Sequence, residues 1–219
     1  MVQHFFGKPR MGRRVVVLLL SVMTMGVCVG VFDQLGFGTD PCSVLNLAVS
    51  RLIGWSFGNY QLLANAVLAA IIIALGEVRR IGLGTLANMT LVGYSADATL
   101  WLLNHTHPLT GETLAVRLIV FVPAIAVFLV AAAFYMVVDL GVAPYDAMPQ
   151  IIAGRQARVG FTAVRMAWDL IVIVLGFLAG GTVGIVTIAM GFFLGPVITG
   201  IANRFRPLFE DNIHGESAA

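Results

Sequence analysis

Long apolar segments recur along the whole chain, separated by short polar stretches. Six of them are about 20 residues long, the length that crosses a hydrocarbon core of roughly 30 Å. They predict membrane-spanning helices at about 15–34, 57–76, 81–103, 114–138, 161–180 and 182–202. Two further segments, 41–53 and 144–153, follow the first and fourth spans and are too short to cross. The pattern predicts an all-α membrane protein with six transmembrane helices and two short interfacial or re-entrant helices.

The turns that follow the first and fourth spans resemble each other. LGFGTDP at 35–41 and LGVAPYD at 140–146 both combine glycine, proline and aspartate after a long apolar segment. Asp40 is a natural N-cap and Pro41 suits the first helical position, so a helix should begin there. The turns are interpreted either as gates that face a binding site or as corners at the membrane surface. The candidate turn residues are Gly36, Gly38, Asp40, Pro41, Gly141, Pro144 and Asp146.

Further positions match between the two halves of the chain. Leu35-Gly36 matches Leu140-Gly141 at an offset of 105 residues. The Gly-x-x-Thr at 82–85 matches the one at 184–187 at an offset of 102. A duplicated unit of three spans is therefore predicted. Because three is odd, the second unit must enter the membrane in the opposite direction, which makes the two units inverted repeats.

The positions of the basic residues predict the orientation, because cytoplasmic loops are enriched in Lys and Arg. Only Arg51 and Arg117 fall outside if the N-terminus is cytoplasmic. The cytoplasmic set is Lys8, Arg10, Arg13, Arg14, Arg79, Arg80, Arg155, Arg158, Arg204 and Arg206. We therefore expect six spans with both termini cytoplasmic. Its predicted parts are a basic segment 1–14, a first repeat 15–104, an external loop 105–113, a second repeat 114–203 and a tail 204–219.

The composition agrees with a lipid bilayer as the surrounding partner. The chain is 59% hydrophobic and 11% charged, and its mean hydropathy is +0.94, whereas soluble domains carry about 25% charged residues. The net charge is only +2, and the basic residues lie at segment ends, so no nucleic-acid surface is expected. Cys28 and Cys42 are too few for a disulfide framework and are predicted to be free thiols.

Ionisable residues inside predicted spans are the main candidates for chemistry, because such groups are costly in lipid. Arg165 and Asp169 stand four residues apart on one helical face and are able to pair. Gln61 and Asn65 match them at an offset of 104 residues and place polar groups at the same depth. The four residues are predicted to line a substrate-binding cavity between the halves. The alternative is a structural ion pair that locks helices together.

Enzymatic motifs are absent from the sequence. It contains no H-E-x-x-H, no G-x-S-x-G, no Walker motif and no dinucleotide fingerprint in a strand–helix context. His105 and His107 have no third ligand nearby, so neither a metal site nor a cofactor is expected. Asp33 and Asp139 lie near span ends, where we expect them to be solvated.

The turn at 36–41, the GLGT at 82–85 and the Gly195-Pro196 pair resemble the YczE/YyaS/YitT family of bacterial integral membrane proteins, especially its YczE-like branch. The resemblance extends over roughly residues 12–205. It implies a plasma-membrane location and a role in transport or in the regulation of secretion-related activities. It supplies no catalytic residues.

Two functions are consistent with these patterns. The leading hypothesis is a small-molecule transporter or permease-like protein of unknown substrate. The alternative is a membrane binding or regulatory subunit, either a substrate-capture component or a scaffold for another membrane complex, without transport of its own. A membrane protein partner and a homo-oligomer are both compatible with the sequence.

Overall fold

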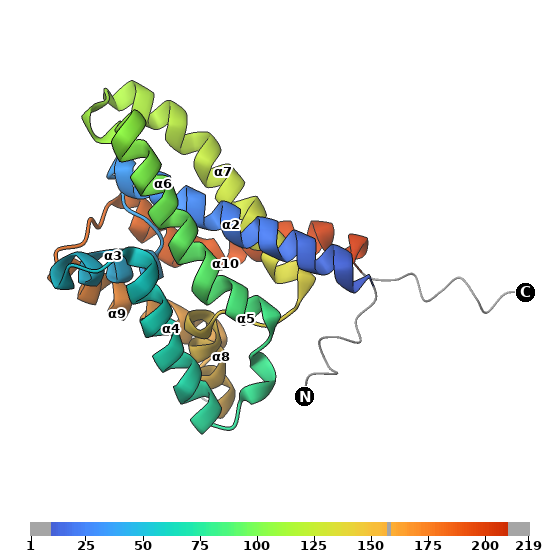
Figure 1. The fold of residues 1–219 in the computed structure, drawn as a ribbon. Helices are drawn as coiled ribbons and strands as arrows, with labels where there is room; N and C mark the ends of the chain where they lie inside the picture. Colours follow the sequence, from blue (N-terminus) through green and yellow to red (C-terminus); the bar gives the residue numbers. More distant parts are fainter. Residues whose placement is uncertain (1–9, 157–158, 210–219) are drawn as a thin grey trace, which may run out of the picture.

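The computed structural model describes residues 10–156 and 159–209, and every regular element in these ranges is helical. Three short 3₁₀ turns, η1 (Val78–Arg80), η3 (Leu109–Gly111) and η4 (Arg206–Leu208), lie between or after the helices. The helices in Figure 1 are α2 (Met11–Leu35), α3 (Pro41–Ile53), α4 (Phe57–Ala74), α5 (Leu83–Ala87), α6 (Gly93–Thr106), α7 (Leu114–Val138), α8 (Pro144–Arg155), α9 (Phe161–Leu178) and α10 (Ile185–Phe205).

Five helices are long and apolar enough to cross a membrane, namely α2, α4, α7, α9 and α10 with η4. They correspond to five of the six predicted spans. The remaining predicted span, 81–103, consists of α5, the π-helical turn η2 (Asn88–Val92) and α6. Asn88 and Gly93, at the two junctions, keep right-handed helical backbone angles, so the helix continues through both. At about 1.5 Å per residue the path from 83 to 106 is roughly 36 Å long.

Local signals set the starts of the two short helices. The Asp40 side chain accepts a hydrogen bond from the Ser43 N–H at 3.1 Å, and Pro41 is the first residue of α3, as predicted. Pro144 likewise opens α8, but the N-cap there is Ala143, which has no capping side chain. An aspartate at an N-cap satisfies a backbone N–H that has no partner within the helix.

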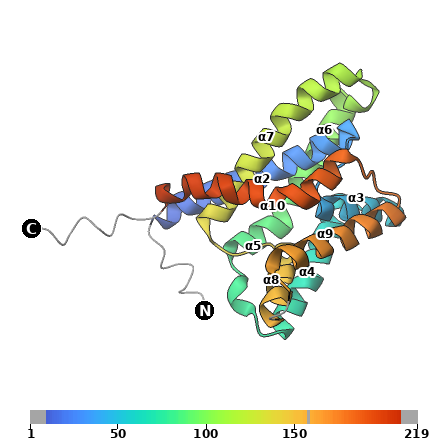
Figure 2. The same ribbon diagram turned by 180° about the vertical axis from the view of Figure 1, so that it is seen from behind.

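The helices pack in pairs that repeat between the two halves (Figures 1 and 2). The long helices α2 and α7 cross each other and form the most extensive contact. On either side of this pair, α6 packs on α2 and α10 packs on α7. Each short helix packs against both α4 and α9: α3 packs mainly on α9 and also on α4, and α8 packs on α4 and α9 alike. The buried core between the long helices includes Leu18, Val22, Phe32, Phe128 and Val138.

The turn after each long helix inserts into the opposite half of the chain. Gly38, after α2, lies against the Gly184 backbone at the start of α10, and a Cβ added to Gly38 would collide with Thr187. Gly141, after α7, lies against Gly82, whose nitrogen would be 2.7 Å from an added Cβ. Both turn glycines have left-handed backbones, with φ of +93° and +119°. Each turn therefore requires a residue without a side chain.

These contacts correct the predicted register of the repeat. Gly38 and Gly141 occupy equivalent places, so the offset at the turns is 103 residues, and the predicted offset of 105 is wrong. The counterpart of Gly36 is Asp139, since each directly follows a long helix and has a left-handed φ, +66° and +48° respectively. The Leu-Gly similarity was misleading because it matched the helix-ending Gly36 with the packing glycine Gly141.

Two arginines, Arg14 and Arg117, are separated by the corrected offset of 103 residues and make matching contacts. Arg14, near the start of α2, donates to the carbonyl oxygen of Val138 at the end of α7, at 2.9 Å. Arg117, near the start of α7, donates to the carbonyl oxygen of Leu35 at the end of α2. The last carbonyl groups of a helix lack intrahelical donors, and a cation there is favoured by the helix dipole. Each long helix therefore caps the C-terminus of the other.

Replacing Gly38 or Gly141 by alanine is expected to lower the stability by roughly 2 to 4 kcal/mol, because the new methyl group overlaps the opposite half of the chain. Gly54→Ala is the matched control, since Gly54 has a φ of +70° but nothing within 4 Å of an added Cβ. That variant should lose only about 1 kcal/mol, the cost of the left-handed backbone. Thermal unfolding in a mild detergent measures the difference. Equal losses of stability in all three variants would show that the close approach of Gly38 and Gly141 to the opposite half of the chain is not what makes alanine unfavourable there.

Candidate functional site

A cluster of charged side chains lies between α8 and α9. Arg165 donates from Nη1 to Asp146 Oδ1 at 2.6 Å and from Nε to Asp169 Oδ2 at 2.8 Å. The Asp169 side chain is 5% exposed, that of Arg165 21% and that of Asp146 39%. The predicted pairing of Arg165 with Asp169 is confirmed. Asp146 was predicted as a turn residue, and Arg165 and Asp169 were predicted as substrate-binding residues. These two predicted groups therefore meet in one cluster.

Tyr145 completes the cluster and was missed from the sequence. Its hydroxyl donates to Asp169 Oδ1 at 2.6 Å. Its ring centroid lies 5.3 Å from the guanidinium carbon of Arg165 and 5.8 Å from the ring centroid of Trp168. Tyr145 and Arg165 therefore each bind one oxygen of the buried Asp169 carboxylate. The only sequence signal for this role is its position in the Pro-Tyr-Asp turn.

The α8 helix begins at this cluster, and the start of α3 lies within electrostatic reach of it. Asp40, the N-cap of α3, lies within electrostatic reach of Asp146 and Asp169. Cys42, in the first turn of α3, lies within electrostatic reach of Arg165 as well. A helix N-terminus carries about half a positive charge. The cluster itself holds two carboxylates and one guanidinium group beside the start of α8, and a third carboxylate, that of Asp40 in the other half of the chain, lies within electrostatic reach.

This arrangement is suited to a small polar molecule with an anionic group. The pair between Asp146 and Arg165 is the more exposed of the two ion pairs. A carboxylate or phosphate can accept hydrogen bonds from the planar guanidinium group in place of Asp146. Asp169 would stay in position, because Tyr145 also donates a hydrogen bond to it.

Gln61 and Asn65 are buried on α4, at 4% and 3% exposure. Asn65 Nδ2 donates to the Gln61 carbonyl oxygen at 3.0 Å, and Asn65 Oδ1 is buried without a hydrogen-bond partner. Among the described residues, no hydrogen bond joins either side chain to Arg165 or Asp169. A cavity shared by the four residues therefore stays a prediction.

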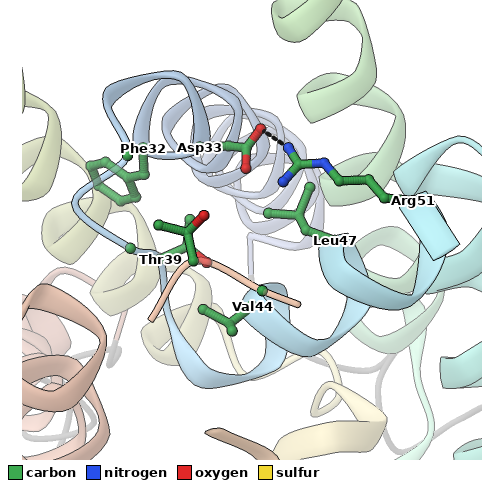
Figure 3. Close-up of a pocket in the computed structure, with 10 residues that line it drawn as sticks. Phe32, Asp33, Thr39, Val44, Leu47 and Arg51 are labelled. Atoms are coloured by element: carbon green, nitrogen blue, oxygen red, sulfur yellow. Dashed lines mark hydrogen bonds and ion pairs between the residues drawn. The ribbon is translucent and has the colours of Figure 1, made fainter. Parts of the chain in front are cut away.

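A small pocket lies where α3 covers the end of α2 (Figure 3). Phe32 and Asp33 line it from α2, and Val44, Leu47 and Arg51 line it from α3. Arg51 forms an ion pair with Asp33, whose side chain is only 8% exposed, so the expectation that Asp33 is solvated is wrong. The cavity volume is about 10 Å³, room for about one water molecule. This pocket is too small for a substrate.

Other candidate chemistry is limited in the part of the chain that the structure describes. Cys28 and Cys42 are free thiols, as predicted. Within residues 10–156 and 159–209, no three His, Cys, Asp or Glu side chains are grouped to hold a metal ion. Lys8 and Arg158, which contributed to the charge argument, lie outside the described residues.

The five apolar helices and the charged centre define a helical membrane protein. Residues 12–203 match the model of a family described as "Family of unknown function (DUF6198)", and the chain belongs to this family. The chain is also similar to an uncharacterized protein of Haemophilus influenzae. The two are 26% identical over 182 residues, which cover 83% of this chain and 80% of that protein. No solved structure matches the chain.

Replacing Arg165 by glutamine is expected to lower the stability by roughly 3 kcal/mol, because Asp146 and Asp169 then lack a cation. Adding Asp169→Asn to the same chain should recover part of that loss, since the more deeply buried carboxylate is removed. The resulting Gln–Asn pair is the one that α4 carries at Gln61 and Asn65. Thermal unfolding of both variants beside the wild type measures the effect. A double variant less stable than the single one would contradict this account of the cluster.

Glu77→Gln is the control for loss of charge alone. Glu77 forms a partly exposed ion pair with Arg80, in which the two side chains are 34% and 30% exposed. Partly exposed pairs are worth at most about 1 kcal/mol. This variant should therefore unfold within a few degrees of the wild type.

Proposed function

We propose that the chain is a six-span membrane protein with two inverted three-helix repeats, and that it acts as a small-molecule transporter or permease-like protein. Its substrate is proposed to carry an anionic group. The observation that carries the proposal is the cluster of Asp146, Arg165 and Asp169 beside the start of α8. Ionisable groups among membrane helices are costly and mark substrate or ion paths. An enzymatic role forms no part of this proposal.

Reciprocal contacts support the inverted repeats. The turn of each half docks on the opposite half, and Arg14 and Arg117 each cap the other long helix. Each short helix also packs on a long helix of the opposite half, α3 on α9 and α8 on α4. Inverted repeats that meet near the bilayer midplane are a recurrent plan of secondary transporters.

The start of α3 supports re-entrant rather than interfacial short helices. In the proposed topology, the turn before α3 follows a span that ends outside, and the turn before α8 follows a span that ends inside. Asp40 nevertheless lies within electrostatic reach of Asp146. Turns from opposite faces approach one another only if both run into the protein toward the midplane. The N-termini of α3 and α8 would then face one site from two sides, which suits an anion.

Each residue of the cluster has a separate role in the proposed site. Arg165 binds the anionic group of the substrate. Asp146 occupies that position on Arg165 before the substrate arrives, so entry exchanges one carboxylate for another anion. Asp169, held by Tyr145, keeps Arg165 oriented. The proposed lining also includes two polar residues of α4, Gln61 and Asn65.

The proposed orientation has both termini in the cytoplasm and the chain in a bacterial inner membrane. Arg51 and Arg117 are the two arginines on the outer side. Arg51 pairs with Asp33, and Arg117 donates to the Leu35 carbonyl oxygen. Because both arginines have protein partners, they do not weigh against the positive-inside rule. Kinship with the YczE/YyaS/YitT family is part of the same proposal and rests on the Gly-rich motifs.

A binding or regulatory subunit is the second candidate function. The observation that favours it is that Arg165 already has two carboxylate partners. Such a network also suits a fixed lock between α8 and α9, which a scaffold or substrate-capture component requires. That protein would co-purify with a membrane partner in a fixed ratio.

Thermal unfolding of the purified chain, with small carboxylates, phosphates, zwitterions and cations added one at a time, tests the proposal. A ligand at 100 times its Kd stabilises the folded state by about 2.7 kcal/mol, and we expect this effect from compounds with an anionic group. Asp146→Asn should raise the affinity, because it removes the carboxylate that competes for Arg165. Arg165→Lys should lower the affinity, because it loses the planar pair of donors.

Asp33→Asn is the matched control, since it removes a carboxylate from an arginine outside the centre. It should leave ligand affinity unchanged. Ligand binding that is unchanged in folded Arg165→Lys and Asp169→Asn variants would show that the site assignment is wrong. Uptake of the ligand into proteoliposomes then separates a transporter from a capture component. A stoichiometric membrane partner without any ligand response would support the regulatory function.

A further inference from the structure

An apolar groove runs between α2 and α7, and none of the charged cluster lines it. Its cavity volume is about 500 Å³, within the range of roughly 300 to 1,000 Å³ that ligand sites have. Leu20 and Val127 in its walls are 62% and 48% exposed, so the groove opens onto the outer surface of the helices. Ser21 and Thr24 are the only polar side chains among the lining residues.

Arginines gather at one end of this groove. Arg13 lies one helical turn before Val17 and on the same face of α2 as Leu20 and Thr24, because residues three or four apart share a face. The Arg13 guanidinium carbon lies 5.2 Å from the centroid of the Phe209 ring. The start of α2 and the end of α10 lie together in Figure 1, so the basic residues of both helices share this end of the molecule. They are Arg10, Arg13, Arg14, Arg204 and Arg206.

We propose that the groove binds an acyl chain of an anionic phospholipid whose phosphate group is held by Arg13. Charge complementarity selects this occupant. The apolar walls suit the hydrocarbon chain, and the guanidinium group suits a phosphate. Basic residues beside a membrane helix attract anionic lipids, and pockets between helices at that level bind their head groups.

A second copy of the chain fits this surface less well. Copies in one membrane share their orientation, and a two-fold interface pairs each patch with itself. A dimer across this groove would therefore bring the arginine-rich ends of two copies together. Like charges in close contact oppose such a dimer, whereas a phosphate group neutralises them.

Lipid retention by the purified full chain tests the proposal. The protein in mild detergent is mixed with equal amounts of phosphatidylglycerol and phosphatidylcholine, and bound lipid is measured by native mass spectrometry. The wild type should retain phosphatidylglycerol in preference, and Arg13→Gln should lower that preference about fivefold. Val127→Trp fills the groove and should remove the retention of both lipids.

Two matched controls separate the groove from general effects. Arg79→Gln removes an exposed arginine between α4 and α5, and Ile119→Trp adds the same bulk to α7 at a 72% exposed position outside the groove. Both should retain lipid like the wild type. An equal loss of preference in Arg79→Gln and Arg13→Gln, or full retention in Val127→Trp, would overturn the proposal. A wild-type dimer that Val127→Trp converts to a lipid-free monomer would instead assign the groove to a second copy.

Discussion

The turn after each long helix inserts into the opposite half of the chain, and this constraint sets where the short helices α3 and α8 begin. Gly38 approaches the backbone of Gly184, and Gly141 approaches that of Gly82, at distances that exclude a side chain. Because each turn is fixed by the opposite half, the following short helix must begin inside the protein. Arg14 and Arg117 each donate a hydrogen bond to the last carbonyl group of the other long helix, directly before the inserted turn. The charged centre follows from this arrangement.

The cost of the charged cluster explains why it lies where it does. Removing carboxylates and a guanidinium group from water is expensive, and mutual attraction offsets the cost only with good geometry and further hydrogen bonds. Arg165 supplies two short hydrogen bonds, and Tyr145 supplies a third, to Asp169. The N-termini of α3 and α8 add partial positive charge on the side of Asp40 and Asp146.

Features set by local chemistry could be predicted from the sequence. The span lengths follow from the bilayer thickness, and the start of α3 follows from the Asp40-Pro41 pair. The register of the repeat could not be read in the same way. A glycine that ends a helix and a glycine that permits close packing look alike in sequence, so Gly36 was matched with Gly141.

Features that depend on tertiary approach were missed. The contact of Asp146 with Arg165 requires the turn to fold back toward α9, and no local pattern encodes that path. The burial of Asp33 requires α3 to cover the end of α2 and to supply Arg51. Tyr145 was missed for the same reason, because its hydrogen-bond partner Asp169 lies on another helix.

The corrected register also shows how unequally the two halves contribute to the centre. At the offset of 103 residues found in the turns, Tyr145 and Asp146 correspond to Cys42 and Ser43. At the offset of 104 residues in the spans, Arg165 and Asp169 correspond to Gln61 and Asn65, and none of these four counterparts carries a formal charge. At the N-cap position the charge lies in the first half instead, because Asp40 corresponds to the uncharged Ala143. A second ion cluster would repeat the desolvation cost, while both helix N-termini already face the first. The hydrogen-bonded charges of the cluster therefore all come from the second half of the chain, and the matching positions of the first half carry uncharged side chains.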